Sequence, residues 1–218
     1  MPTTIHVVDD DASFRTAIAR QLRVTGYDVV QYESANQLLD RLPVDVGTCC
    51  ILLDVQIPDL PGPQLQMRLA ALGSTLPIIF LTGYGDIPTS VHAIKAGAAD
   101  FLTKPVAMPT LLGAIELAIS RHLAARTQDA RLEKLRCLVA TLTPRERAVF
   151  ELVVRGRMNK QIAHALGTTE RTIKAHRHKV MLKIGVASLA DLAAIAERLG
   201  FLNTPPAIVE LNMSRGLQ

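Results

Sequence analysis

The chain has 218 residues, of which 49% are hydrophobic and 20% are charged, enough to build the core of one large domain or of two modest ones. Charged residues interrupt every apolar stretch before it reaches the roughly 18 residues of a membrane span, and the first residues lack the basic region of a secretory signal. These features predict a cytoplasmic protein without a membrane partner. The net charge of +4 is divided unevenly, with −5 in residues 1–120 and +9 in residues 121–218. We therefore expect a cation-binding module followed by a polyanion-binding module.

The three cysteines are Cys49, Cys50 and Cys137. Their number is odd and their spacing matches no metal motif, which argues against a disulfide framework and against a zinc site. We interpret Cys49 and Cys50 as small core residues.

Short β-branched runs alternate with helical periodicity through residue 120, a pattern typical of βα units around a parallel sheet. The predicted strands cover residues 4–9, 28–32, 49–54, 77–82 and 99–103. The first predicted helix carries Phe14, Ile18 and Leu22 on one face. Three further helices are predicted from Ser34 to Arg41, from Pro63 to Leu72, and from Ile87 to Ala96, where Gly97 ends the last one. The expected fold class is α/β, a flavodoxin-like doubly wound domain with a five-stranded parallel sheet.

A helix is predicted from Thr110 to about Arg136, where proline is absent and apolar residues are interspersed with charges. Because these apolar positions do not keep a strict heptad, the helix could support a dimer or could be an exposed linker. We expect a first domain at 1–120, a helical linker at 121–140, a small all-α domain of four helices at 141–202, and a tail at 203–218.

Polar residues follow four of the predicted strands where the strands end. Asp9 ends the first and Asp10 follows it, Asp54 ends the third, Thr82 ends the fourth, and Lys104 follows the fifth. The carboxyl ends of parallel strands meet at one edge, where open α/β sheets bind ligands. Carboxylates about 4 Å apart repel by roughly 4 kcal/mol at an effective dielectric of 20, so a cation is expected among them. All-oxygen ligands favour Mg²⁺, and the lysine and hydroxyl suit a phosphoryl group on Asp54.

The segments VVDDD, LLDVQIPDLPG, FLTGYGD and AIKAGAADFLTKP resemble, in order, the receiver domain of two-component response regulators, and the match covers residues 4–120. This resemblance implies the following roles: Asp9 and Asp10 as the acidic pair for Mg²⁺, Asp54 as phosphoacceptor and metal ligand, the backbone carbonyl of Gln56 as a further ligand, Thr82 and Phe101 as the switch pair, and Lys104 as the lysine before a cis proline. Asp11 is expected only to support the acidic pair, and Asp59 to form a turn.

The basic half predicts a helix-turn-helix. Thr143-Pro144-Arg145-Glu146 forms a capping box that begins a helix running to about Arg155. A second helix runs from Asn159 or Lys160 to Leu166, a turn follows at Gly167-Thr168, and a third helix covers residues 170–183. On this third helix Arg171, Lys174, Ala175 and His178 share one face. A basic face opposite an apolar one suits a helix in the DNA major groove.

The stretch from Leu142 to Leu192 is similar to a LuxR-type DNA-binding domain, which follows receivers in the FixJ/NarL group. By position, Lys174, Ala175 and His178 are expected to contact bases or the groove, and Arg171, Arg177, Lys179 and Lys160 to contact phosphates. Met158 stands where relatives often have Ser, so Asn159 is the expected helix cap.

These observations predict a response regulator transcription factor and not a turnover enzyme. Its expected partners are a sensor histidine kinase, double-stranded promoter DNA, RNA polymerase and, on phosphorylation, a second copy of the chain. Two alternatives remain at this point. A Mg²⁺-dependent aspartyl-phosphate hydrolase would use the same acids but turn over a free substrate, and a constitutive regulator or protein-binding hub would use the first domain only as a dimerisation scaffold.

Overall fold

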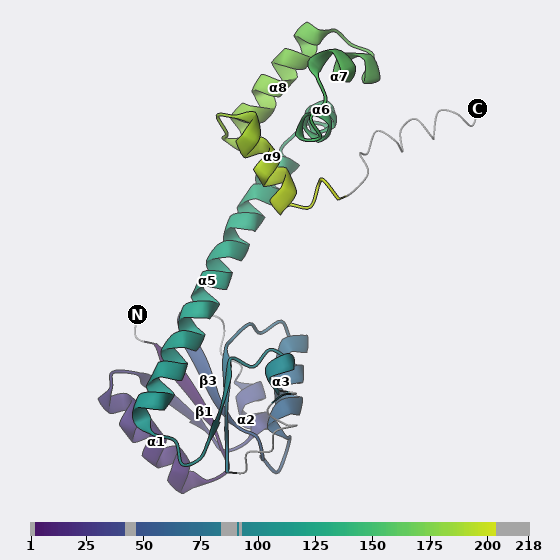
Figure 1. Cartoon of the computed structure of the whole chain (residues 1–218). Coiled ribbons are helices and arrows are strands. Elements are labelled where there is room, and N and C mark those ends of the chain that lie inside the picture. The colour runs from purple at the N-terminus through teal and green to yellow at the C-terminus, as the bar shows by residue number, and fades with distance from the viewer. Residues whose placement is uncertain (1–2, 42–46, 84–90, 92, 204–218) are drawn as a thin grey trace, which may run out of the picture. The chain divides into compact units, whose positions relative to one another are not determined.

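The computed structural model describes residues 3–41, 47–83, 91 and 93–203, and its first part is a five-stranded sheet (Figure 1). The strands are β1 (Thr4–Val8), β2 (Asp28–Tyr32), β3 (Cys49–Asp54), β4 (Ile78–Thr82) and β5 (Asp100–Thr103). All neighbours pair in parallel in the order β2-β1-β3-β4-β5. This is the strand order of the flavodoxin-like doubly wound fold, so the predicted fold class is confirmed.

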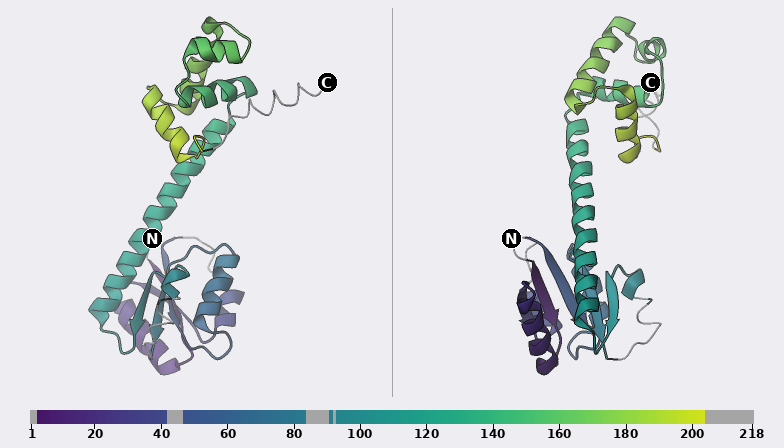
Figure 2. Two further views of the ribbon diagram at one scale, coloured as in Figure 1. Left: turned by 45° about the vertical axis from the view of Figure 1, so that its right-hand side comes forward. Right: turned by 60° about the vertical axis from the view of Figure 1, so that its left-hand side comes forward.

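Helices cover both faces of this sheet, as the views in Figures 1 and 2 agree. The helices α1 (Ala12–Val24) and α5 (Met108–Ala140) lie on one face, and α2 (Ala35–Asp40) and α3 (Gly62–Ala71) lie on the other. Ser34 caps α2 as predicted, because its hydroxyl accepts the Gln37 N–H at 3.1 Å.

The helix predicted at residues 87–96 falls partly outside the described residues. Residues 91 and 93–95 are helical, while 84–90 and 92 are not described. Gly97 follows with φ of 96°, the left-handed conformation expected of a glycine at a helix end.

Strand β3 divides the core into two layers. Ile51 and Leu53 pack among the residues beneath α2 and α3, whereas Cys50 and Leu52 pack among those beneath α1 and α5. This alternation follows from the two-residue period of a strand. Because both faces are covered, all six residues of β3 are buried, which explains its continuous apolar run. Cys49 and Cys50 are buried and form no disulfide, as expected of core residues.

Helix α5 is longer than predicted at both ends. It begins at Met108 instead of Thr110, because Pro109 fits in a first helical turn, and it continues to Ala140. Residues 121–140, expected to form a linker, lie within this helix. The chain divides into two compact units, Met1–Arg126 and Thr127–Gln218.

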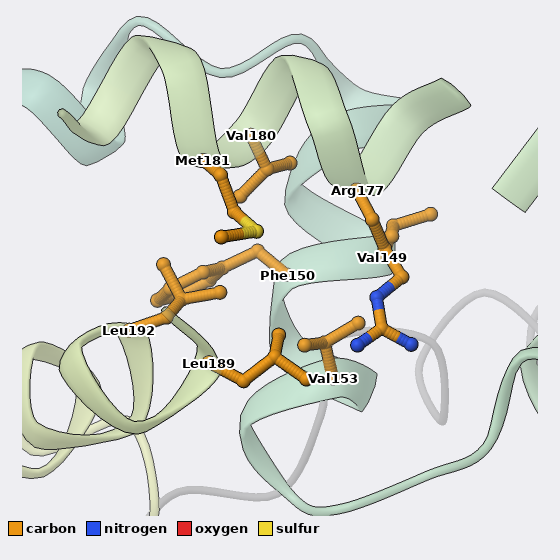
Figure 3. A pocket seen from close by; sticks show the side chains of 8 residues that line it. All are labelled: Val149, Phe150, Val153, Arg177, Val180, Met181, Leu189 and Leu192. Carbon is orange, nitrogen blue, oxygen red and sulfur yellow. The ribbon is translucent and has the colours of Figure 1, made fainter. Parts of the chain in front are cut away.

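The second unit contains α6 (Pro144–Val154), α7 (Asn159–Ala165), α8 (Glu170–Ile184) and α9 (Leu189–Arg198). Its core includes Phe150 of α6, Val180 of α8 and Leu192 of α9. Figure 3 shows these side chains converging between the three helices, and they leave no void large enough for a water molecule. The capping box predicted at Thr143 and Glu146 is present at the start of α6.

One helix cap differs from the prediction. The residue that caps α7 is Met158, and not Asn159, which is the first residue of the helix. The Gln161 side chain accepts the Met158 backbone N–H at 3.0 Å, which is the return bond of a capping box. Asn159 instead uses its side-chain oxygen to accept a hydrogen bond from Arg177.

Within the described part of the chain, every helix is too short or too polar to span a bilayer. The predicted tail lies outside the described residues except for residue 203.

Candidate functional site

The sheet brings the polar strand ends together at its carboxyl edge. Val8 of β1 pairs with Leu53 of β3, so the residues that follow them, Asp9 and Asp54, end adjacent strands. On the other side of β3, Thr82 ends β4, and its backbone carbonyl accepts the Lys104 N–H at 2.6 Å. Four predicted site residues from four different strands therefore meet at one edge.

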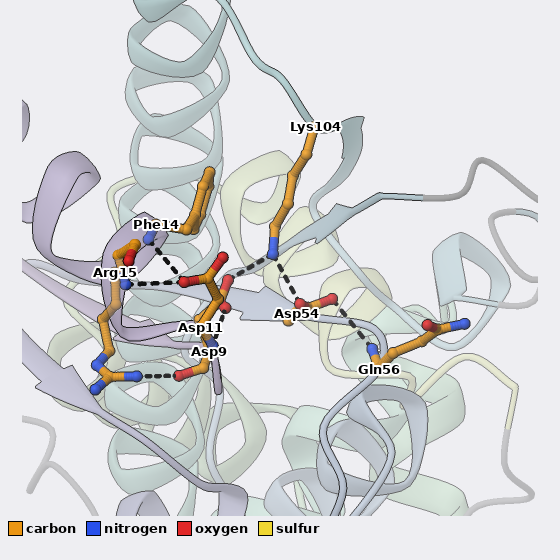
Figure 4. Close-up of polar contacts among 8 residues, drawn as sticks. Asp9, Asp11, Phe14, Arg15, Asp54, Gln56 and Lys104 are labelled. Atoms are coloured by element: carbon orange, nitrogen blue, oxygen red, sulfur yellow. Dashed lines mark hydrogen bonds and ion pairs between the residues drawn. The ribbon is translucent and has the colours of Figure 1, made fainter.

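The Lys104 ammonium bridges the two buried carboxylates (Figure 4). Its Nζ lies 2.6 Å from Asp9 Oδ2 and 2.7 Å from Asp54 Oδ2. The Lys104 side chain is 16% exposed, and those of Asp9 and Asp54 are 2% and 12% exposed. Charged hydrogen bonds of this length, shielded from water, fix the three side chains against one another. The Lys104–Pro105 peptide bond is cis, as the resemblance implied.

Backbone N–H groups hold the remaining carboxylate oxygens. Asp9 Oδ1 accepts the Asp11 N–H at 3.0 Å, and Asp54 Oδ1 accepts the Gln56 N–H at 3.1 Å. Asp11 also caps α1, because its carboxylate accepts the N–H groups of Ser13 and Phe14. The hydrogen bond from the Asp11 N–H to Asp9 agrees with the expectation that Asp11 supports the acidic pair.

Burial and the oppositely charged neighbours act in opposite directions on the pKa values of Asp9 and Lys104. Burial raises the pKa of the Asp9 carboxyl above its ordinary value, although the Lys104 ammonium opposes the rise. Burial acts to lower the pKa of Lys104, but its hydrogen bonds to Asp54 and Asp9 outweigh that effect and the pKa is raised. Lys104 is therefore a fixed positive charge at neutral pH.

A third carboxylate completes the cluster. Asp10 is exposed, and one carboxylate oxygen from each of Asp9, Asp10 and Asp54 lies within 4.8 Å of the others. An all-oxygen donor set on a rigid strand edge fits the preference of Mg²⁺, which retains several waters and takes few protein carboxylates. The donor chemistry of these residues thus fits the predicted ion.

Glycine at position 62 lets α3 begin beside Asp54. A Cβ atom on Gly62 would lie 2.5 Å from the Asp54 carbonyl oxygen and 2.9 Å from Phe80 Cε1. The Gly62 N–H donates to the Val55 carbonyl at 3.0 Å, which fixes this close approach. Sequence reasoning missed this role, although a glycine directly after the Pro58 to Pro61 turn was a signal for it.

Asp59 contributes to the same edge in a different way. Its two carboxylate oxygens accept the backbone N–H groups of Ala35 and Asn36 at 3.3 and 2.9 Å, in the first turn of α2. Instead of serving only as a turn former, Asp59 ties the segment after Asp54 to the next helix.

The two residues predicted as a switch pair lie on neighbouring strands. Thr82 is 2% exposed at the end of β4. Phe101 on β5 is half-buried, with its ring centroid 6.2 Å from that of Phe80. Beside Phe101 an open surface hollow is lined by Val91, Ile94, Lys95 and Asp100.

In the second unit, helix α8 presents most of the predicted DNA contacts to solvent. Arg171, Lys174, Ala175, His178 and Lys179 are exposed on it, and Lys160 is exposed on α7. Ile173, Val180 and Ile184 are buried on the opposite side. Thr169 caps the start of α8 by accepting the Thr172 N–H at 3.2 Å, and Gly185 ends it in the left-handed conformation. A firmly capped helix with one basic, exposed face is the arrangement that groove binding requires.

Arg177 is less exposed than the other residues predicted to contact DNA. It is half-buried and donates a hydrogen bond to the Asn159 side chain of α7. Its aliphatic part also lines the core between α6, α8 and α9 (Figure 3). In this structure Arg177 therefore joins the two helices of the helix-turn-helix.

Comparison with known protein families identifies a family for each of the two units. The model of the response regulator receiver domain matches residues 5–116, and the model of bacterial regulatory proteins of the luxR family matches residues 140–196. The two matches coincide with the sheet that carries the acidic edge and with the helices that carry the basic face.

Several proteins resemble the chain over nearly its whole length. Nodulation protein W of Bradyrhizobium diazoefficiens is 44% identical over 90% of this chain and 86% of its own. Transcriptional regulatory protein FixJ of the same species is 39% identical over 91% and 97%.

Solved structures agree with these matches. The response regulator StyR superposes with a TM-score of 0.78 at 40% identity, covering 91% of this chain and all 100% of that one. Full-length FixJ from B. japonicum gives a TM-score of 0.56 at 38% identity, covering 90% and 97%. The chain therefore belongs to the response regulators and is a transcription factor of the FixJ type, with a receiver domain followed by a LuxR-type DNA-binding domain.

Proposed function

We propose that this response regulator accepts a phosphoryl group on Asp54 from a sensor histidine kinase and that phosphorylation controls its binding to promoter DNA. The observation that carries the proposal is the Lys104 ammonium held between Asp9 and Asp54 at 2.6 and 2.7 Å. A fixed cation beside a buried carboxylate is placed to stabilise the charge of a transferring phosphoryl group.

In the proposed transfer an Asp54 carboxylate oxygen attacks the phosphorus of the kinase phosphohistidine. The new P–O bond forms as the P–N bond breaks, and the electron pair of that bond returns to the imidazole. The Gln56 N–H at 3.1 Å orients the Asp54 carboxylate, and Lys104 neutralises charge on the phosphoryl oxygens. Asp9, Asp10, Asp54 and the Gln56 carbonyl would hold Mg²⁺, which would supply further positive charge for phosphoryl transfer.

The proposed switch begins with the charge that phosphorylation adds. A phosphoryl group adds about 1.5 to 2 negative charges at neutral pH, beside the Thr82 hydroxyl and Lys104. We propose that Thr82 and Phe101 rearrange in response and expose a dimerisation surface next to β5. The half-buried Phe101 ring beside the open hollow supports this location.

The proposed output is sequence recognition by α8 in the major groove. Lys174, Ala175 and His178 contact bases or the groove, whereas Arg171, Lys179 and Lys160 contact phosphates. Arg177 was predicted as a phosphate contact, and here we propose that it first positions α8 against α7 through Asn159. Two such domains in a dimer bind paired half-sites at a promoter and meet RNA polymerase there. A DNA target supports the proposal that the protein acts in the cytoplasm.

Acceptor identity can be tested with acetyl phosphate and Mg²⁺, followed by intact-protein mass spectrometry. We expect one phosphoryl adduct on the wild type and none on Asp54→Asn. The matched control is Asp28→Asn, which alters an exposed carboxylate at the opposite end of the strands and should be labelled as the wild type is. An undiminished adduct on Asp54→Asn would reject the assignment, and steady release of free phosphate from a small phosphorylated substrate would favour the hydrolase.

A further inference from the structure

Phe14 lies directly against the Lys104 ammonium, a contact that no predicted role explains. Lys104 Nζ is 4.3 Å from the centroid of the Phe14 ring, and Figure 4 shows the ring beside the lysine side chain. This distance is within the range in which the negative face of an aromatic ring attracts a cation.

The ring completes the surroundings of the ammonium. A lysine ammonium has three N–H groups and no lone pair. Hydrogen bonds of 2.6 and 2.7 Å to Asp9 and Asp54 use two of them, and the Phe14 ring supplies a third partner. Because the Lys104 side chain is 16% exposed, the cation–π attraction acts with little competition from water.

Local contacts fix the ring in this position. Phe14 is in the first turn of α1, where its N–H donates to Asp11 at 3.2 Å. In the same turn Arg15 donates to the Asp9 carbonyl at 2.6 Å. The Arg15 guanidinium therefore ties the turn that carries the ring to the segment that carries Asp9.

We propose that Phe14 is a positioning residue for phosphoryl transfer, whose ring keeps the Lys104 ammonium at the site while its carboxylate partners change. This inference rests on the proposed function. Once Asp54 carries a phosphoryl group it is no longer a free carboxylate, and Asp9 would share its charge with a bound cation. The Phe14 ring has neither role, so it remains a partner for Lys104 throughout the reaction.

The kinetic test compares Phe14→Leu, which keeps apolar volume but removes the ring, with Phe14→Tyr, which keeps the ring. With acetyl phosphate at saturating Mg²⁺, we expect Phe14→Leu to slow phosphorylation about five- to tenfold and Phe14→Tyr to stay within about twofold of wild type. Equal losses in both variants would contradict a role for the ring.

Repeating the comparison in a Lys104→Met variant distinguishes a ring that positions Lys104 from a ring that only packs against its neighbours. In Lys104→Met, which has no ammonium, we expect Phe14→Leu to cause no further loss of rate, because the ring then has nothing to position. If Phe14→Leu slows phosphorylation by the same factor in both backgrounds, the ring acts independently of Lys104 and the proposal fails.

The contact also has a readout that does not depend on phosphorylation. In protein with ¹³C-labelled lysine, the ring current of Phe14 should shift the Lys104 ε-methylene protons upfield, and the signal can be assigned by its loss in Lys104→Met. The shift should vanish in Phe14→Leu, and its absence from the wild type would overturn the contact. If the shift is present but Asp54→Asn is still labelled, the proposed acceptor is wrong while the contact stands.

Discussion

Lys183, in the last turn of α8, donates a 2.6 Å hydrogen bond to the Glu146 carboxylate in the first turn of α6. The same carboxylate accepts the Thr143 N–H at 2.9 Å as part of the capping box. The Lys183 ammonium also reaches the Thr141 carbonyl at 3.3 Å. One buried carboxylate thus caps α6 and anchors the end of the helix proposed to enter the DNA groove. The hydrogen bond from Lys183, followed by that from Thr143, lowers the pKa of Glu146 to about 2.

Replacing this carboxylate should change how the second unit responds to acid. The pKa of Glu146 in the folded protein lies below the ordinary 4.5, so its stabilisation is complete above about pH 4.5 and is lost as the pH falls toward about 2. Glu146→Gln should lower stability at neutral pH and flatten the response across that window. Hydrogen exchange of α6 and α8 peptides over a pH series measures both effects. The exposed Glu197→Gln is the matched control, and an unchanged acid response in Glu146→Gln would refute the prediction.

The buried Asp9 carboxyl should oppose folding at neutral pH. Because burial raises its pKa, the folded protein holds the proton more tightly than the unfolded chain, and stability increases as the pH falls through the folded pKa. We therefore expect Asp9→Asn to raise the thermal unfolding midpoint of the first unit at pH 7 while weakening Mg²⁺ binding in titration calorimetry. The exposed Asp10→Asn should weaken Mg²⁺ binding but change stability by no more than about 0.5 kcal/mol. A lower midpoint in Asp9→Asn would show that its pair with Lys104 outweighs the cost of burial.

Gly62→Ala should damage the first unit, since its Cβ would meet the Asp54 backbone oxygen at 2.5 Å. Overpacking of this kind costs about 1–3 kcal/mol, and displacement of Asp54 should also slow phosphorylation. Chemical denaturation followed by far-UV circular dichroism measures the stability change. Gly113→Ala, in the exposed interior of α5 with open space around the Cβ, should instead add about 1 kcal/mol. Equal effects of the two substitutions would contradict the argument.

Lys174→Ala should weaken binding to promoter DNA about tenfold, because a good base or groove contact is worth about 1–3 kcal/mol. Fluorescence anisotropy with a selected promoter fragment measures the affinity and its salt dependence. The exposed Arg198→Ala on α9 is the control for general loss of positive charge. Affinity unchanged in Lys174→Ala, or reduced equally in the control, would remove Lys174 from the contact surface.

The local sequence pattern was sufficient to predict the strands and the polar residues at their ends. Strand β3 was predicted at its observed bounds, Cys49–Asp54, because a continuous β-branched and leucine run ends at a charged residue. Pairing across the sheet then dictated that Asp9 and Asp54 would meet. In α7 the cap was predicted wrongly, because the helix already includes Asn159 and its N-cap position falls on Met158.

Contacts between distant residues were beyond the sequence pattern. Phe14 was predicted only as part of an apolar helix face, and its meeting with Lys104 depends on how the fold brings the start of α1 and the segment after β5 to the same edge of the sheet. The Glu146 to Lys183 contact joins residues 37 positions apart, so the capping box revealed one role of Glu146 but not the other. To predict the role of Gly62, one would have to know how closely α3 approaches the Asp54 carbonyl.

If phosphorylation of Asp54 controls DNA binding, it should decide which genomic fragments the protein selects. Wild-type protein and Asp54→Asn are each incubated with sheared genomic DNA, with and without acetyl phosphate and Mg²⁺, and the bound fragments are sequenced. We predict that discrete promoter fragments are enriched by phosphorylated wild type and not by Asp54→Asn or by wild type without acetyl phosphate. Equal enrichment under all four conditions would contradict the claim and would identify a constitutive regulator.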